Sequence, residues 1–136
     1  MKSYLLACSL VIGGMFIHHD LSGQNTFHNT IGWLMSEEPN SVVQTADSGY
    51  VLSDYTNSFG ARAEDAFLLK TDKWGIPEWS RLYGGSGQDI AKACINTADG
   101  GFVMGGHTNS YGAGFDDAYL IKTDSTGMLE WTHTYG

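Results

Sequence analysis

Two stretches of the chain carry the same pattern: TADSGYVLSDYTNSFGARAEDAFLLKTDKWGIPEWSRLYG over Thr45–Gly84, and TADGGFVMGGHTNSYGAGFDDAYLIKTDSTGMLEWTHTYG over Thr97–Gly136. They align without a gap at an offset of 52 residues, and 21 of the 40 aligned positions are identical. Most other pairs exchange similar residues, such as Tyr50 with Phe102. A period of about 50 residues is typical of repeat architectures, in which each unit buries its apolar faces against its neighbours.

Each repeat reads as four short strands separated by turns. Asp-x-Gly at residues 47–49 and 99–101 favours a tight turn, and Asp-x-x-Gly at residues 72–75 and 124–127 favours a type I turn followed by a left-handed glycine. A helical period is absent between the strands, which argues against parallel βαβ units. In the second copy the strands are expected at residues 89–97, 101–108, 116–123 and 129–135.

The third strand of each repeat is apolar on both alternating faces, at Ala66–Leu69 and Ala118–Ile121, which predicts that both faces are covered. Gly105 and Gly106 leave room for a close backbone approach. A four-stranded antiparallel unit with neighbours on both faces describes a β-propeller blade. We therefore predict an all-β, propeller-like fold with blade 1 at residues 41–84 and blade 2 at residues 85–136; a β-solenoid and a sandwich are the alternatives.

Residues 1–24 have the order of a secretory signal peptide: Lys2, a 14-residue apolar run from Tyr4 to Ile17, and then small polar residues. The run is too short to span a membrane, which takes about 20 apolar residues. The alternative is a buried N-terminal strand or helix. We expect a secreted or cell-surface protein of bacterial type, in which residues 25–40 form a strand of a preceding or closing blade and a connection.

The composition excludes several classes of protein. The chain contains 18 Gly and 12% aromatic residues but only 16% charged residues, which is unlike a disordered chain or a helical bundle. Its net charge of −8 with no basic cluster argues against a nucleic-acid partner. Cys94 is the single cysteine left after signal removal, so no internal disulfide is expected, and a buried thiol is the simplest interpretation.

The segment Lys70-Thr-Asp72-x-x-Gly75-x-x-x-Trp79 recurs 52 residues later and resembles the tryptophan-docking motif of quinoprotein-like β-propellers. The resemblance implies that Asp and Gly shape a hairpin between the last two strands of a blade, and that the Trp docks on the neighbouring blade. The motif has one residue fewer between Asp and Gly and lacks the usual Thr, so we expect no quinone cofactor. The residues assigned a structural role, with both tryptophans largely buried, are Asp72, Gly75, Trp79, Asp124, Gly127 and Trp131.

The fuller consensus over residues 41–136 (T-x-DGG-[YF]-V, T-N-S-[FY]-G, D-A-[FY]-L-[LI]-K-T-D, E-W-x-x-x-YG) is similar to repeats of large exported bacterial proteins. These proteins often end in a type IX secretion sorting domain, and some are labelled endoglucanases. The resemblance implies surface or secreted propeller repeats.

Few residues have a pattern that points to chemistry. Gly84–Ala91 matches the opening of a calcium-binding nonapeptide, but the motif occurs once, and a glycine-rich connection is the simpler interpretation. The acid pairs at 37–38, 64–65 and 116–117 put their side chains on opposite faces of a strand, which does not suit a catalytic pair. His28, His107 and His133 lack metal-ligand spacing. Trp33 and Trp74 fall outside the repeat and could stack on a sugar or a protein, with local packing as the alternative.

We therefore expect no catalytic, cofactor or metal residues, and a non-enzymatic, exported scaffold or binding module. Its expected partner is a protein, a carbohydrate, or other blades of the same or another chain. The alternative is part of a secreted enzyme, a quinoprotein-like oxidoreductase or a carbohydrate-active protein, with its catalytic part outside this chain. Because propellers contain 4–8 blades, we expect a fragment of a longer protein that is poorly soluble or oligomeric when expressed alone.

Overall fold

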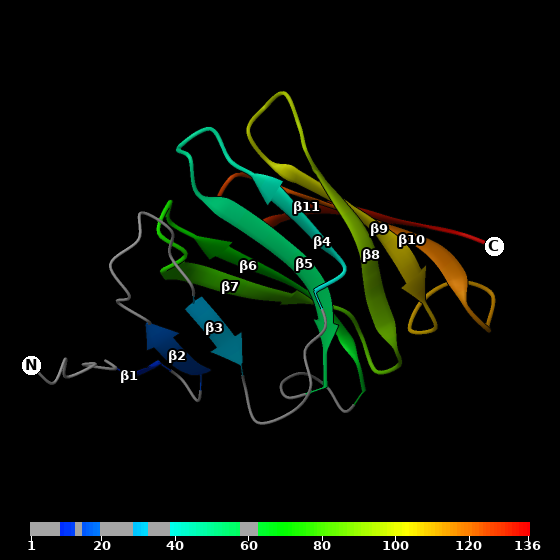
Figure 1. Cartoon of the computed structure of the whole chain (residues 1–136). Coiled ribbons are helices and arrows are strands. Elements are labelled where there is room, and N and C mark those ends of the chain that lie inside the picture. Colours follow the sequence, from blue (N-terminus) through cyan, green and yellow to red (C-terminus); the bar gives the residue numbers. More distant parts are fainter. Residues whose placement is uncertain (1–8, 13–14, 20–28, 33–38, 58–62) are drawn as a thin grey trace, which may run out of the picture.

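The computed structural model describes residues 9–12, 15–19, 29–32, 39–57 and 63–136, and in these residues all regular elements are strands. Two four-stranded antiparallel sheets pack face to face without closing into a ring (Figure 1). The prediction of an all-β fold of incomplete, propeller-like blades is confirmed. The first sheet contains β4 (Ser41–Gln44), β5 (Tyr50–Thr56), β6 (Asp65–Thr71) and β7 (Pro77–Tyr83), and the second contains β8 (Asp89–Asn96), β9 (Phe102–Thr108), β10 (Asp117–Thr123) and β11 (Leu129–Tyr135).

A third, three-stranded sheet contains β1 (Ser9–Ile12), β2 (Met15–His19) and β3 (Asn29–Gly32), in that order. β1 and β2 fall within the predicted signal peptide, and β3 falls within residues 25–40, where a strand and a connection are expected. His28, Trp33 and the acid pair at 37–38 lie outside the described residues. Removal of residues 1–24 on export stays a prediction.

The Asp-x-x-Gly turns form as their sequence predicts. The Asp72 carboxylate accepts hydrogen bonds from the backbone N–H of Trp74 and Ile76, both at 2.8 Å. The backbone N–H of Gly75 donates to the Asp72 carbonyl, and Gly75 has a φ of 74°. Gly127 has a φ of 75° at the equivalent turn, where only glycine avoids a steric penalty. The two hairpins therefore share one geometry.

The two faces of each sheet have different roles. We call the side that carries Leu68 or Leu120 the front face, and the side that carries Leu69 or Ile121 the back face. The front face of the first sheet packs on the back face of the second, and the buried side chains between them form one cluster: Val51, Ala66, Leu68 and Tyr83 from the first sheet, with Ala91, Cys94, Phe102, Met104, Tyr119 and Ile121 from the second.

Burial of the third strand differs between the repeats. Every residue of β6 is buried, as the doubly apolar pattern predicts. In β10 the prediction is wrong: Tyr119 and Ile121 are buried on the back face, whereas Ala118 is exposed and Leu120 is half-buried on the front face. The physical reason is that the front face of the second sheet has no sheet packed on it among the described residues.

Gly106 meets the expectation of a close backbone approach, and Gly105 does not. A Cβ built on Gly106 would lie 1.7 Å from the carbonyl oxygen of Ile90, beside a bulge of β8 between Ala91 and Ala93. A Cβ on Gly105 would first meet the Leu120 side chain, at 3.6 Å, which is ordinary contact. Gly106 therefore allows β8 to bend against β9.

A buried lysine ties the turns of each sheet together. Lys70 Nζ lies 2.9 Å from Asp47 Oδ2 and 2.8 Å from Glu78 Oε2, and it donates to the carbonyl of Thr71 at 2.8 Å. Burial alone would lower the pKa of Lys70, but the bonds to Glu78 and Asp47 outweigh it and raise the pKa. Bonds from the Thr45 hydroxyl and Lys70 hold the pKa of Asp47 well below its usual value. Lys70 and Asp47 therefore both favour their charged forms. Through Asp47 and Glu78, the lysine links the β4–β5 turn to the β6–β7 hairpin.

The second sheet repeats this arrangement at Lys122, with Asp99 and Glu130 both at 2.9 Å. In each sheet a glycine makes room for a backbone carbonyl, that of Thr71 or Thr123, and for the lysine head that binds the same carbonyl. A Cβ on Gly49 would lie 2.5 Å from Lys70 Nζ, and one on Gly101 would lie 2.7 Å from Lys122 Nζ. The D-x-G and K-T-D segments recur together because the Asp of the first binds the Lys of the second in each repeat.

Ser48 and Gly100 occupy equivalent turn positions with φ of 70° and 84°, and they offer a matched pair of substitutions. We predict that Ser48→Gly stabilises the chain by about 0.5–1 kcal/mol, because a side chain is strained at this φ. Gly100→Ser should destabilise by a similar amount, since its surroundings are open and only the backbone angle opposes a side chain. Urea unfolding measures both. Shifts of the same sign would contradict this account of the turn.

Candidate functional site

Two aromatic side chains of β7 form the outer end of the contact between the two sheets. A Cβ on Gly127 would lie 2.7 Å from Trp79 Cζ3, so the indole lies directly on the Asp124–Gly127 turn of the second sheet. Trp79 also meets Phe102, with the ring centroids 6.3 Å apart. The Tyr83 hydroxyl donates to the Gly127 carbonyl at 2.7 Å. Gly127 is therefore the residue of the second sheet that both β7 side chains contact.

Trp131 stands at the position of Trp79 in the second repeat but has no such partner. It is 39% exposed, so the expectation that both tryptophans are largely buried is wrong for Trp131. Trp79 is only partly buried, although it packs against the core. The cause of the difference is that no described element covers the front face of the second sheet.

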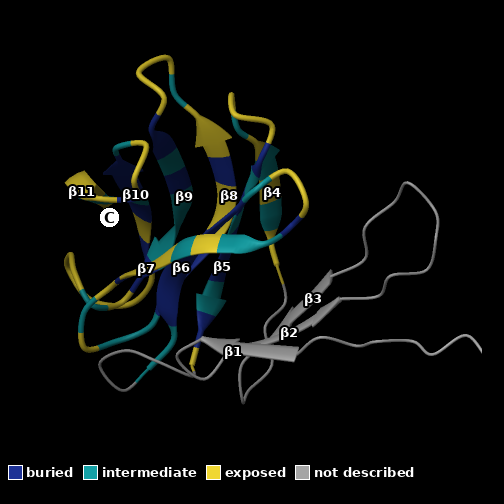
Figure 2. Ribbon diagram, turned by 90° about the vertical axis from the view of Figure 1, so that its left-hand side faces the viewer, coloured by how far each residue is buried: buried dark blue, intermediate teal, exposed yellow. Residues whose placement is uncertain are grey.

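The residues of this open face can be identified from their counterparts in the first repeat. Each core residue of the first sheet's front face has its counterpart here at an offset of 52: Val51, Ala66, Leu68, Trp79 and Tyr83 correspond to Val103, Ala118, Leu120, Trp131 and Tyr135. Tyr135 is 60% exposed, whereas Tyr83 is buried. Ile95, the counterpart of the partly buried Val43, is also 60% exposed. Figure 2 draws β11 almost entirely in the exposed colour.

Charge is scarce on this face, although the chain has 15 acidic residues. In β9, β10 and β11 the positions of the front face hold one charged side chain, Lys122, whose head binds Asp99 and Glu130. Bonds from Thr97 and Lys122 hold the pKa of Asp99 well below its usual value, so this carboxylate stays charged with its partner. The face therefore presents apolar and aromatic surface without an unpaired carboxylate on these strands.

Three rings form a row along β11. Trp131 and His133 have ring centroids 5.1 Å apart, and His133 and Tyr135 have theirs 6.3 Å apart. Alternate residues of a strand point to one side, so the row lies on the front face. Sequence reasoning identified Trp131 but missed Tyr135, although the Tyr83–Tyr135 identity in the repeat was a usable signal.

The calcium-like segment forms the connection between the sheets. The buried Asp89 carboxylate accepts hydrogen bonds from the Thr108 hydroxyl, from the backbone N–H of Gly85 at 2.8 Å and from the Ser110 hydroxyl at 2.5 Å. Gly84 has no room for a side chain, because a Cβ there would lie 2.5 Å from Asp65 Oδ1. The described residues hold no group of three or more His, Cys, Asp or Glu side chains arranged for a metal ion. Asp89 thus fixes the interblade connection.

The repeated acid pairs also serve the turns. Asp65 and Asp117 are buried, and the Asp117 carboxylate accepts from the backbone N–H of Ala113 at 2.9 Å. Glu64 instead binds the Gln88 side chain, and its carbonyl accepts from the backbone N–H of Asp89 at 2.6 Å. Neighbouring acids therefore bind different groups rather than facing one another across a cleft.

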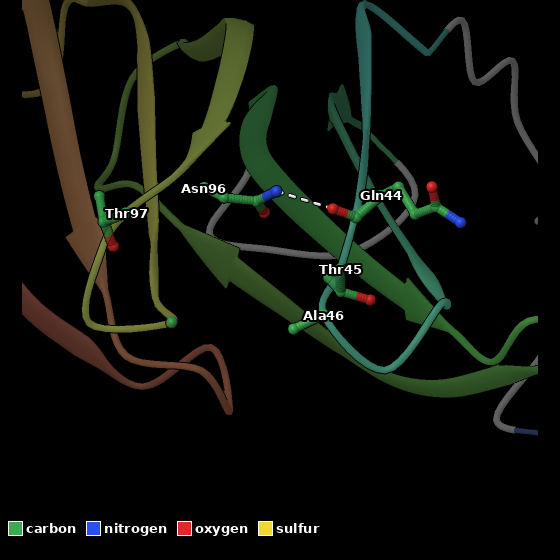
Figure 3. Close-up of a pocket in the computed structure, with 6 residues that line it drawn as sticks. Gln44, Thr45, Ala46, Asn96 and Thr97 are labelled. Carbon is green, nitrogen blue, oxygen red and sulfur yellow. Dashed lines mark hydrogen bonds between the residues drawn. The ribbon is translucent and has the colours of Figure 1, made fainter.

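Two cavities open at the junction of the sheets. One, of about 330 Å³, lies between the ends of β4 and β8, where the Asn96 side chain donates to the Gln44 carbonyl at 2.7 Å (Figure 3). The other, of about 400 Å³, lies between β7 and β11 and is lined in part by Tyr83, Tyr111 and Tyr119. Neither cavity is lined by a carboxylate, so neither holds the acid pair that glycoside hydrolysis needs.

The other singled-out side chains have local roles. Cys94 is buried as expected, and burial raises the pKa of its thiol to about 11, which leaves it protonated at neutral pH. His133 belongs to the aromatic row, and His107 lies half-buried on β9. Trp74 is exposed on its turn with Lys73 Nζ 5.1 Å from its ring centroid.

No family model matches the chain, and a search of curated proteins finds no match either. In the part of the chain that the structure describes, no helix has the length and apolarity needed to cross a membrane. The fold and its open face are therefore the basis for any proposal about function.

Trp79 and Trp131 provide a matched pair for testing the contact. We predict that Trp79→Ala destabilises the chain by about 2–4 kcal/mol, because it removes an indole packed on Gly127 and Phe102. Trp131→Ala should cost less than about 1 kcal/mol, as is usual for exposed positions. Thermal or urea unfolding measures both, and equal losses would contradict the difference in packing.

Proposed function

We propose that this chain is an exported, non-enzymatic β-propeller-like repeat module that acts as a scaffold or binding surface. The observation that carries the proposal is the open front face of the second sheet. It repeats the apolar and aromatic residues that hold the first sheet to its neighbour, and of these Ala118, Trp131 and Tyr135 are exposed whereas Val103 and Leu120 are half-buried.

The arrangement of polar groups supports a binding role over catalysis. Asp72, Asp89, Asp117 and Asp124 each accept backbone N–H groups at turns and connections. Carboxylates whose oxygens bind backbone N–H groups in this way stabilise a turn or a connection, and they are poorly placed to exchange protons with a substrate. The proposed partner is a protein or a carbohydrate that covers an apolar sheet face.

The resemblance to tryptophan-docking propellers supports the same role. In this chain Trp79 lies on the Asp-x-x-Gly turn of the neighbouring repeat, which is the contact that the resemblance implies. The export part of the proposal rests on the order of charge and apolarity in residues 1–24.

The non-enzymatic part is tested by assaying the purified chain against soluble β-glucans and for binding of a quinone cofactor. We expect no product above the buffer control and no bound quinone. Hydrolysis that disappears in an Asp116→Asn or Glu64→Gln variant would overturn the proposal, because these exposed or half-buried acids can change without loss of the buried network. Hydrolysis that persists in both variants would indicate a contaminating enzyme.

Export is tested by fusing residues 1–24 to an alkaline phosphatase that is active only after disulfide formation outside the cytoplasm. We expect activity from the fusion in bacterial cells. A control with Leu10→Asp and Ile12→Asp interrupts the apolar run and should remove that activity. An inactive parent fusion that is present at normal levels would contradict the signal peptide.

A further inference from the structure

The open front face of the second sheet has a partner whose chemistry can be read from the molecule. Within the chain, an equivalent front face is already occupied, and its occupant is the back face of a repeat. We propose that the open face is a docking surface for the back face of a further repeat of this same class. The inference deepens the proposed binding function and rests on it.

The first argument is equivalence of the receiving surface. Five front-face positions of the first sheet that pack against the second are occupied by the same residue types in the second sheet, with Val, Ala, Leu, Trp and Tyr each retained, and a sixth changes only from Val43 to Ile95. A surface of this composition buries well against apolar side chains and gains about 25 cal/mol for each Å² of apolar area removed from water. A polar partner would leave that gain unrealised.

The second argument is the polar anchor that accompanies the packing. The Tyr83 hydroxyl donates to the Gly127 carbonyl, and Trp79 lies on Gly127, where a side chain would clash. Tyr135 and Trp131 present the same hydroxyl and indole to solvent. The occupant should therefore bring an Asp-x-x-Gly turn, placing its glycine under Trp131 and the glycine carbonyl at the Tyr135 hydroxyl.

The third argument is electrostatic. The back face of the second sheet is apolar at Phe102, Met104, Tyr119 and Ile121, and the open front face has no unpaired carboxylate along β9–β11. Like-charge repulsion, which a net charge of −8 imposes on most encounters between acidic surfaces, is therefore small at this contact. A face whose one charged side chain on β9–β11 is already paired with Asp99 and Glu130 fits an apolar sheet better than a charged ligand.

The end of the contact where Asn40 and Ser41 bond to β8 shows where the open face differs from the occupied one. In the existing contact the Asn40 side chain donates to the Ala91 carbonyl at 2.9 Å, and the Ser41 hydroxyl accepts from the backbone N–H of Cys94 at 3.2 Å. Their counterparts in the second repeat are Lys92 and Ala93, which do not reproduce these bonds. The part of the open face that holds Trp131 and Tyr135 therefore determines which partner binds there.

The test appends a second copy of residues 85–136 directly after Gly136, so that the 52-residue register continues. In the appended copy, Trp131→Phe and Tyr135→Phe make the original peptide distinguishable by mass spectrometry. Hydroxyl-radical footprinting then reports the exposure of Trp131 and Tyr135 in the chain and in the extended chain. We expect oxidation of both side chains to fall several-fold on extension, as the face becomes covered.

A stability readout accompanies the footprint. Trp131→Ala should change the melting temperature of the original chain by no more than a degree or two, and should lower that of the extended chain by about 5 °C or more. Trp74→Ala, which removes an exposed tryptophan from a turn, is the matched control and should act equally in both proteins. A third protein, whose appended copy carries Met104→Asp and Ile121→Asp, should lose the protection of Trp131.

Several results would overturn the inference. One is an appended copy that folds but leaves Trp131 as exposed as in the original chain. Another is an appended copy that remains unfolded although the open face is available to it. Protection of Trp131 in the original chain by a dimer or ring of fixed stoichiometry would make a second copy the occupant instead. Protection by a cello-oligosaccharide would make the face a sugar platform. All of these outcomes are separate from the glucan, quinone and export assays, so failure here is distinguishable from failure of the proposed function.

Discussion

The packing of one sheet's front face on the next sheet's back face is the contact on which the rest of the structure depends. This contact removes the apolar front face of the first sheet and the apolar back face of the second from water. Trp79 and Tyr83 meet Gly127 at the outer end of this contact, and Asn40 and Ser41 bond to β8 at the inner end. The glycine-rich connection between β7 and β8 brings β8 to this position. The hydrogen bonds of the Asp89 carboxylate hold the connection in place.

The turns of each sheet are held by charged groups so that the faces can stay apolar. Lys70 and Lys122 each bind two carboxylates and a backbone carbonyl, and these bonds join turns at one end of the sheet. Because the lysine heads are buried and paired, removing one partner would leave an uncompensated charge. This explains why the glycines at 49 and 101, which make room for the lysine heads, recur with the lysines themselves.

The asymmetry between the two repeats bears on function more than any single residue does. Ala66 and Tyr83 are buried in the first sheet, whereas their counterparts Ala118 and Tyr135 are exposed in the second, so equivalent residues serve as core in one place and as surface in the other. This exposed apolar face is the observation on which the proposed binding role rests. The described residues hold no group of three or more His, Cys, Asp or Glu side chains arranged for a metal ion.

The sequence alone determined the repeat, the strand positions to within a residue in the second copy, and the glycine turns, because these depend on local patterns of apolarity and backbone angle. Local patterns cannot specify which faces meet. The burial of β6 and the exposure of Ala118 on β10 follow from the presence or absence of a neighbouring sheet, and the two strands have nearly the same sequence. The bonds of Asp89 to Thr108 and Ser110, and the different surroundings of Trp79 and Trp131, were likewise decided by the tertiary structure, because they join segments far apart along the chain.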